Sequence, residues 1–133
     1  MIVPAPDATI GDTFFQCARA FGANAFLAVP ANPARGYHPA GHELSYTAAA
    51  LAYLIQDSPK PIVLTGSQKP MGNPFTDAKL NLYQSLLYAL DEHSHDVSIV
   101  FGGVAIAGTR ARKQRTMSFN AFISVNYPPI AYI

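Results

Sequence analysis

Two short segments of the chain carry residue types that could act on a small polar substrate. The turn 65–68 directly follows the apolar run 62–64, so a strand there would deliver Ser67 and Gln68 to the edge of a sheet. Both side chains could hydrogen-bond a small substrate, and a turn or helix N-terminus nearby could receive its carboxylate. Lys113 lies downstream and supplies an amine that could be held near them. Taken alone, the segment 65–68 also fits a plain strand-ending turn.

Lys113 belongs to a basic cluster, since four of the nine basic residues lie within positions 110–115. The arginines most simply form a solvated charge cluster. For Lys113 the functional alternative is a proton relay, and neighbouring cations would help to lower its pKa. The net charge is only +1, and the cluster lacks stacking aromatic residues and a recognisable binding module. We therefore expect neither nucleic acid nor a membrane as a partner.

The pair His93 and His95, with acidic residues at 91, 92 and 96, could bind a metal weakly. An exposed polar connector is the simpler interpretation, because no ligand spacing of a recognised zinc type is present. The glycines between 102 and 108 do not form a G-x-G-x-x-G fingerprint, so they predict no nucleotide.

The composition suits one compact domain, because half of the 133 residues are hydrophobic and 13% are charged. A single cysteine, Cys17, excludes an internal disulfide. Residues 1–10 lack the features of a signal peptide. The apolar stretch 48–55 is far shorter than the ~20 residues that cross a bilayer. We expect a soluble cytoplasmic protein.

Apolar spacing predicts the elements that position the candidate residues. Helices are expected over 43–56, ended by Pro59 and Pro61, and over 77–90, with Thr76 as the N-cap. The first helix has apolar residues at helical spacing from Leu44 to Ile55, and the second carries one stripe formed by Leu80, Tyr83, Leu87 and Leu90. Strands are expected over 62–65 and 97–101, the second closed by Gly102-Gly103.

A strand, a helix and a strand in this order predict an α/β fold, with a parallel sheet of βαβ units flanked by helices and a right-handed crossover. Ligands of such sheets bind beyond the carboxyl ends of the strands, where the turns 65–68 and 102–103 would lie. Residues 1–42 have no usable period, although 11–21 could form a short helix and 25–29 a short strand.

As a series, six segments resemble the N-terminal domain of the bacterial-type L-asparaginases, in family order and at family spacing across about 90 residues. They are Glu43-Leu44-Ser45-Tyr46-Thr47-Ala48-Ala49-Ala50-Leu51, Lys60-Pro61-Ile62-Val63-Leu64-Thr65-Gly66-Ser67-Gln68-Lys69-Pro70, Asp77-Ala78-Lys79-Leu80-Asn81-Leu82, Val100-Phe101-Gly102-Gly103, Gly108-Thr109-Arg110-Ala111-Arg112-Lys113 and Ser124-Val125-Asn126-Tyr127-Pro128-Pro129.

The resemblance implies an α/β domain, normally followed by a smaller C-terminal domain, that hydrolyses L-asparagine to aspartate and ammonia. It implies homo-oligomers, namely dimers or tetramers, and neither a metal nor an organic cofactor. Lys113 matches the family's proton-relay lysine. Ser67 matches the position beside the substrate amide, and Gln68 is next to it. In the family a threonine attacks the amide, while a second threonine, an aspartate and the lysine handle protons.

The sequence departs from the family before Glu43. The family's His-Gly-Thr-Asp segment corresponds to Pro39-Ala40-Gly41-His42, where Gly41 has no hydroxyl and His42 no carboxylate. The nucleophile segment Thr-Gly-Gly-Thr-Ile is absent, and Thr9 or Thr13 is only a faint echo of it. We expect residues 1–42 to be an unmatched segment, produced by a frameshift, a rearrangement or a mis-assigned start, which translation of the other two frames would test. Residues 43–133 would form part of the N-terminal domain, incomplete at its N-terminal side and without the C-terminal domain.

The expected function is therefore an L-asparaginase-type amidohydrolase, with this chain a catalytically impaired fragment. One alternative is a non-enzymatic binding or interaction module for small acidic amino acids that keeps the edge formed by Ser67 and Lys113. Another is a fragment that does not fold stably by itself.

Overall fold

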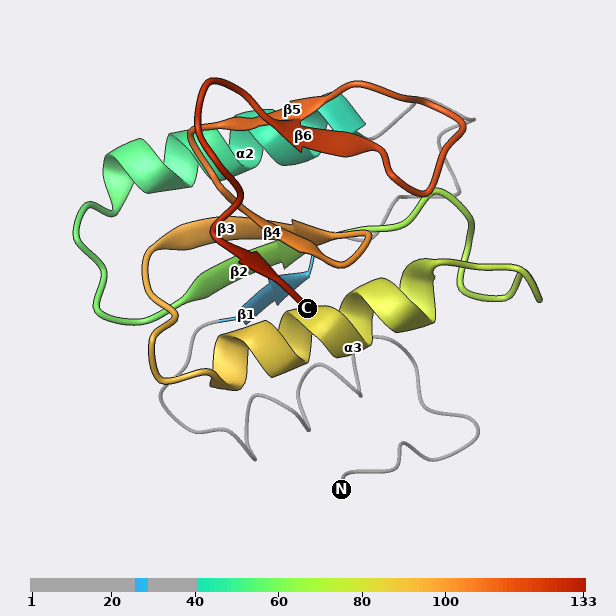
Figure 1. The fold of residues 1–133 in the computed structure, drawn as a ribbon, viewed down its shortest axis with the longest axis horizontal. Helices are drawn as coiled ribbons and strands as arrows, with labels where there is room; N and C mark the ends of the chain where they lie inside the picture. Colours follow the sequence, from blue (N-terminus) through green and yellow to red (C-terminus); the bar gives the residue numbers. More distant parts are fainter. Residues whose placement is uncertain (1–25, 29–40) are drawn as a thin grey trace.

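The structure, a computed structural model, describes residues 26–28 and 41–133 and has two helices and seven strands in this part of the chain (Figure 1). The helices are α2 (Gly41–Leu54) and α3 (Ala78–Leu90). The strands are β1 (Phe26–Ala28), β2 (Ile62–Thr65), β3 (Val97–Phe101), β4 (Val104–Ala107), β5 (Ala111–Lys113), β6 (Phe122–Ser124) and β7 (Ala131–Tyr132). The helix expected over 11–21 lies outside the described residues.

The main sheet has the strand order β1-β2-β3-β4-β7. β1, β2 and β3 are parallel neighbours, with Val63 opposite Phe26 on one side and Ser98 on the other. The predicted α/β class and the unit β2–α3–β3 are therefore confirmed. The strand expected over 25–29 is present as β1, so part of the segment 1–42 belongs to this sheet.

The far half of the sheet differs from the predicted parallel arrangement, because β4 and β7 run antiparallel to their neighbours. Gly102 and Gly103 do more than end β3: they form a two-residue hairpin turn to β4, with φ of +60° and +81°. Such turns need the left-handed region at both positions, which glycine reaches without steric cost. β5 and β6 form a separate antiparallel pair packed against α2.

The two helices cover opposite faces of the main sheet (Figure 1). α2 packs on the face that carries Leu64 and Ile99, and α3 packs on the face that carries Val63 and Val100. The parallel strands β1, β2 and β3 lie side by side in chain order, and the two helices that connect them lie on opposite faces of the sheet. The crossovers β1–α2–β2 and β2–α3–β3 therefore have opposite hands. One of them therefore departs from the right-handed rule.

The helix boundaries differ from the predicted ones by two residues or fewer. α2 begins at Gly41 and ends at Leu54, so the break in resemblance before Glu43 falls inside a helix. α3 has Asp77 rather than Thr76 as its N-cap residue, and the Asp77 side chain forms no capping hydrogen bond. The Thr76 hydroxyl instead accepts the Ala78 amide at 3.0 Å. Asp77 is thus free to bind elsewhere.

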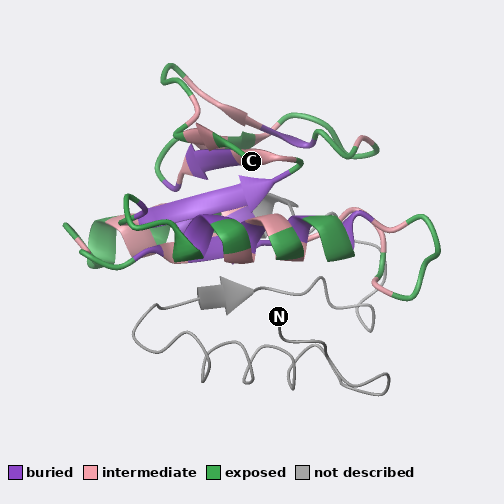
Figure 2. Ribbon diagram, turned by 60° about the horizontal axis from the view of Figure 1, so that its bottom comes forward, coloured by how far each residue is buried: buried purple, intermediate pink, exposed green. Residues whose placement is uncertain are grey.

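α3 turns its apolar stripe away from the sheet. Its buried residues are mostly small or polar, and the large apolar residues of the predicted stripe lie on the outer side (Figure 2). The exposed fractions along that stripe are 58% for Leu80, 60% for Tyr83, 43% for Leu87 and 47% for Leu90. Neither described helix is long and apolar enough to cross a membrane.

Candidate functional site

The turn after β2 is fixed by two hydrogen bonds to neighbouring elements. The Thr65 hydroxyl donates to the Val100 carbonyl of β3 at 2.7 Å. The Gly66 carbonyl accepts from the side-chain amide of Asn81 on α3 at 2.9 Å. Ser67 follows directly and is half-buried, and its hydroxyl forms no hydrogen bond with the described residues. The backbone is therefore held in place while the Ser67 hydroxyl remains available to a ligand.

The Asp77 carboxylate organises the next part of the turn. It accepts the Gln68 amide through both oxygens, at 3.0 and 2.9 Å, and the Lys69 amide at 3.1 Å. The Asn81 side chain also donates to it at 3.1 Å. Asp77 and Asn81 are buried, with exposed fractions of 8% and 1%. A buried carboxylate is costly unless it is hydrogen-bonded, and four donor contacts meet that requirement here.

Asn81 links the two strand-end turns that the sequence predicted at one edge. Its amide group donates to Gly66 after β2, and its carbonyl oxygen accepts the Gly102 amide after β3 at 3.0 Å. The sequence reasoning missed Asp77 and Asn81 as site-building residues. The available signal was their spacing of four at the start of a helix, which places both side chains on one face.

The Gln68 side chain joins this turn to the loop between β5 and β6. Its Nε2 donates to the Ser118 carbonyl at 2.9 Å and to the Arg115 carbonyl at 3.3 Å. Lys69 adds a second link, because its Nζ lies 5.5 Å from the centre of the Phe119 ring and 6.0 Å from that of Phe75. The two loops lie at the same end of the molecule (Figure 1).

Lys113 ends β5, opposite Phe122 of β6, at the side from which the 114–121 loop leaves. It is half-buried, and burial lowers the pKa of its amine from the usual 10.5. The predicted direction is therefore confirmed, but the cause is desolvation and not the neighbouring cations. The arginines at 110, 112 and 115 are exposed, as expected of a solvated cluster. Within the described residues, Lys113 forms no ion pair.

The structure thus connects the Ser67 turn to the loop that follows Lys113 through the hydrogen bonds of Gln68 and the Lys69 contact with Phe119. The side-chain nitrogen of Gln68 donates hydrogen bonds to the Arg115 and Ser118 carbonyls. The Ser67 hydroxyl and the Lys113 amine form no hydrogen bond with the described residues. A hydroxyl that can hydrogen-bond a substrate, and an amine that gives up its proton more readily than usual, suit proton transfer during hydrolysis. Gly41 and His42 begin α2, and nothing in their side chains supplies a hydroxyl or a carboxylate.

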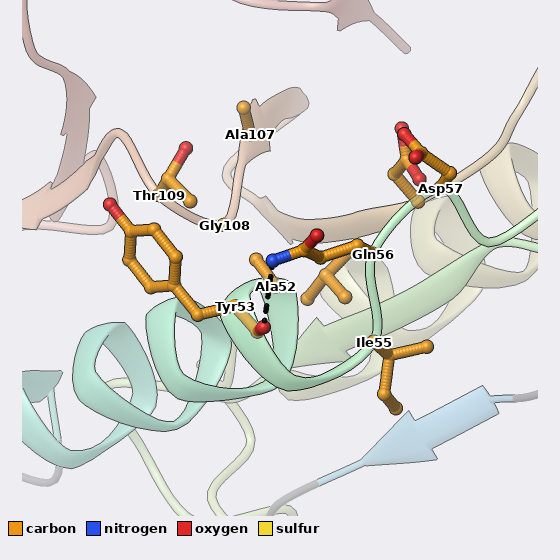
Figure 3. Close-up of a pocket in the computed structure, with 10 residues that line it drawn as sticks. Ala52, Tyr53, Ile55, Gln56, Asp57, Ala107, Gly108 and Thr109 are labelled. Carbon is orange, nitrogen blue, oxygen red and sulfur yellow. Dashed lines mark hydrogen bonds between the residues drawn. The ribbon is translucent and has the colours of Figure 1, made fainter.

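A cavity of about 360 Å³ lies at the opposite edge of the sheet, between the end of α2, the start of β3 and the turn after β4 (Figure 3). Tyr53, Gln56, Asp57 and Thr109 place polar atoms around it, and the Gln56 side chain is turned back onto the Tyr53 carbonyl at 3.3 Å. It contains none of the predicted site residues.

The histidines of the connector before β3 are exposed. His93 contacts Asp91 at 3.1 Å and His95 contacts Asp96 at 3.7 Å. Within the described part of the chain, no three histidine, cysteine or acidic side chains come together as a metal site would require. The polar-connector interpretation fits this arrangement.

Sequence comparison matches residues 42–133 to the family model described as "Asparaginase, N-terminal". The chain is 40% identical over 90 residues to the L-asparaginase of Thermococcus kodakarensis, covering 68% of this chain and 27% of that protein. It is 33% identical over 87 residues to L-asparaginase 1 of Escherichia coli, covering 65% and 26%. One component of the glutamyl-tRNA(Gln) amidotransferase of Metallosphaera sedula matches at 38% over 97 residues, covering 68% and 22%. The chain spans about a quarter of the length of these relatives.

Comparison of structures gives the same group of proteins. The thermostable L-asparaginase from Thermococcus kodakarensis superposes with a TM-score of 0.71 at 32% identity, over 90% of this chain and 34% of that one. L-asparaginase I from Vibrio cholerae superposes with a TM-score of 0.67 at 25% identity, over 98% of this chain and 38% of that one. The mixed sheet with helices on both faces is therefore the arrangement found in these structures.

Proposed function

The chain belongs to the asparaginase family, and we propose that its residues 43–133 form the part of an amide-hydrolysing domain that holds the proton-relay lysine and the turn beside the substrate amide. The substrate would be L-asparagine, hydrolysed to aspartate and ammonia without a metal or organic cofactor. The observation that carries this proposal is the Gln68 side chain, which ties the Ser67 turn to the loop that follows Lys113. Cytoplasmic location remains a prediction.

Three residues have distinct roles in this proposal. Ser67 contacts the substrate amide through its hydroxyl, which forms no hydrogen bond with the residues that the structure describes. Lys113 transfers a proton, and the burial that lowers the pKa of its amine raises the fraction of neutral amine at a given pH. Gln68 lies beside the substrate and holds the lysine loop in position, because its nitrogen is bound to the Arg115 and Ser118 carbonyls.

For this chain as it stands, we propose little or no turnover. The positions that correspond to the family's threonine and aspartate are Gly41 and His42, and neither can accept or relay a proton in the same way. No segment of the chain reproduces the nucleophile strand. Catalytic residues act as a unit, so the loss of several costs many powers of ten in rate. In this proposal the chain keeps Lys113 and the Ser67 turn but lacks the nucleophile and the threonine–aspartate pair.

The alternative is a binding module for small acidic amino acids. The specific observation in its favour is that the Ser67 turn and the Lys113 strand are both held in place, although the catalytic pair is replaced. Binding of aspartate without hydrolysis of asparagine, measured by calorimetry, would favour it. If the chain neither bound aspartate nor hydrolysed asparagine, the binding module would be ruled out and the chain would be an inactive structural fragment.

An ammonia-release assay with L-asparagine and L-glutamine tests the activity of the purified chain. We expect release at the background rate, with an intact L-asparaginase as the positive control. Turnover near that of the intact enzyme would show that this chain has another nucleophile, and the proposed impairment would be wrong.

A chimera tests the proposed role of residues 43–133. This segment replaces the matching segment of the Thermococcus kodakarensis L-asparaginase, so that the missing catalytic residues come from the host. We expect L-asparagine hydrolysis by the chimera and a loss of about 10²–10⁴-fold on Lys113→Met, the range for a proton-transfer group. Arg112→Met, one residue away and exposed, is the matched control. An equal effect of the two substitutions would remove Lys113 from the mechanism.

A further inference from the structure

The cavity at the edge of the sheet opposite the candidate site has the size of a small-molecule site. It lies between the end of α2, the start of β3 and the turn after β4, and its volume is about 360 Å³ (Figure 3). Ligand pockets measure ~300–1,000 Å³, whereas one water molecule takes up ~30 Å³. The cavity can therefore hold a small organic molecule and is larger than a single ion needs.

The walls of this cavity are fixed by backbone contacts. Gly108 donates its amide to the Val97 carbonyl at 2.8 Å, and a Cβ at residue 108 would lie 3.0 Å from the carbonyl oxygens of both Val97 and Ala48. The missing side chain thus lets the turn after β4 approach α2 and β3 closely. The Asp96 amide donates to the Ser58 carbonyl at 3.1 Å, which ties the start of β3 to the segment after α2. The cavity is therefore pre-formed, as ligand sites usually are.

The polar groups around the cavity are acidic or neutral. Asp57 and Asp96 supply two carboxylates, and three neutral side chains supply hydroxyl and amide oxygens: Tyr53, Gln56 and Thr109. Among the described residues that line the cavity, none is a lysine, an arginine or a histidine. In the described part of the chain Asp57 forms no ion pair, and Asp96 contacts only the exposed His95, at 3.7 Å. The lining thus carries a negative charge that its own residues do not balance.

The end of α2 is a second source of negative potential at the cavity, separate from the two aspartates. The last carbonyl groups of a helix carry a partial negative charge, which a nearby cation stabilises. α2 is 14 residues long, and its last turn contains no basic residue. The Gln56 nitrogen is turned back onto the Tyr53 carbonyl at 3.3 Å, while the Gln56 oxygen forms no hydrogen bond with the described residues (Figure 3). A positively charged hydrogen-bond donor would suit the helix end, the amide oxygen and the carboxylates together.

The apolar part of the lining favours an organic cation over a metal ion. Ala52, Val97 and Ala107 present hydrocarbon to the cavity, which a hydrated metal ion does not use. Within the described residues, no three metal-ligating side chains come together. We propose that this cavity binds a small organic cation, namely an ammonium group carried on a short aliphatic chain. The ammonium group donates hydrogen bonds to Asp57 and Asp96, and the aliphatic chain lies on the apolar wall.

This inference is independent of amide hydrolysis, because none of the residues that carry it belongs to the candidate site. Its experimental test therefore does not depend on the activity of the chain.

A titration of the full ¹⁵N-labelled chain with 1,4-diaminobutane, followed through amide chemical shifts, tests the binding and its location. 1,4-Butanediol and succinate have the same carbon skeleton but are neutral and negatively charged, so they are matched probes. We expect saturable shifts for the amides of residues 52–57, 96–97 and 107–109 with the diamine and with neither of the other two compounds. The amides of the turn 65–68 should not shift.

Substitution of the two aspartates tests the role of their charge. Asp57 and Asp96 have φ of +51° and +56°, a region that asparagine adopts as readily as aspartate, so Asp57→Asn and Asp96→Asn keep the backbone and remove the charge. Each should raise the dissociation constant of the diamine about tenfold, the effect of losing a hydrogen bond to a charged group. Asp91→Asn is the matched control, because Asp91 is an exposed carboxylate that does not line the cavity and its loss changes the net charge equally. Circular dichroism checks that all three variants fold.

Four results would overturn the proposal. The first is the absence of saturable shifts with the diamine. Equal affinity for 1,4-butanediol would show that the positive charge is not recognised. Equal weakening by Asp91→Asn and Asp57→Asn would indicate general attraction to an acidic surface. Saturable binding of Ca²⁺ at the same amides, without binding of the diamine, would make the cavity a metal site.

Discussion

Asn81 donates a hydrogen bond from its side-chain amide to the Asp77 carboxylate at 3.1 Å, one helical turn away, and both side chains are buried. From this position Asn81 holds the turn after β2 through the Gly66 carbonyl and the turn after β3 through the Gly102 amide. Asp77 binds the backbone amides of Gln68 and Lys69. The start of α3 therefore determines the relative position of the two turns that form the edge of the candidate site.

Replacing Asn81 with leucine should destabilise the fold, because it leaves the Gly66 carbonyl and the Gly102 amide without their partner. Both of these hydrogen bonds are part-buried, and the buried contact with the Asp77 carboxylate is lost as well, so we expect a loss of about 1–3 kcal/mol in the free energy of unfolding. Urea denaturation provides the measurement, with the exposed Asn120→Leu as the control. A loss of under about 0.5 kcal/mol would mean that the two turns do not depend on Asn81.

Gly102→Ala should be costly for two reasons. Residue 102 has φ of +60°, and a Cβ there would lie 3.0 Å from the Phe119 carbonyl oxygen in the 114–121 loop. We expect a loss of about 1–3 kcal/mol, the usual range for such backbone strain. Gly72→Ala is a matched control, since a Cβ at residue 72 meets nothing within 4 Å and Gly72 has no positive φ. Thermal melts of the two variants should differ clearly in midpoint. Equal midpoints would show that residue 102 tolerates a side chain without strain.

Gln68→Leu should loosen the loop 114–121 while leaving the core intact. The substitution removes the donor to the Arg115 and Ser118 carbonyls, and a net loss of about 1 kcal/mol is expected for such contacts. Amide hydrogen exchange should accelerate in residues 114–121 but not in β3. Gln56→Leu, which removes only a local exposed contact to Tyr53, should leave that exchange unchanged. Unchanged exchange in Gln68→Leu would show that the loop is held by other contacts.

Lys113 should give the stability of the protein a defined dependence on pH. Burial lowers the pKa of its amine in the folded state, so between the folded and unfolded pKa values the unfolded chain binds more protons. Stability relative to Lys113→Met should therefore rise as the pH increases through this window, up to the ordinary lysine pKa of 10.5. Urea denaturation of both proteins in steps from pH 7 to pH 10.5 measures the difference. A difference that falls with pH would mean that the amine is stabilised as a cation in the fold.

The local pattern of the sequence was sufficient for the elements near the candidate site. β2 and β3 were predicted with their observed bounds, and α3 to within one residue, because apolar runs, prolines and glycines act over a few positions. The motifs around Ser67, Gln68 and Lys113 also indicated the asparaginase family, and family membership is confirmed by the match over residues 42–133. The roles of these three residues stay predictions.

The tertiary structure alone decided how these elements meet. The antiparallel run of β4 depends on whether Gly102-Gly103 ends a strand or turns it back, and both outcomes use the same residues. The hydrogen bonds from Gln68 to the Arg115 and Ser118 carbonyls join residues that are far apart in the sequence, and so does the packing of α2 and α3 on opposite faces of the sheet. Periodicity shows that the large apolar residues of α3 lie on one side of the helix. Which side faces the sheet depends on the hydrogen bonds of Asp77 and Asn81, which draw the polar face inwards.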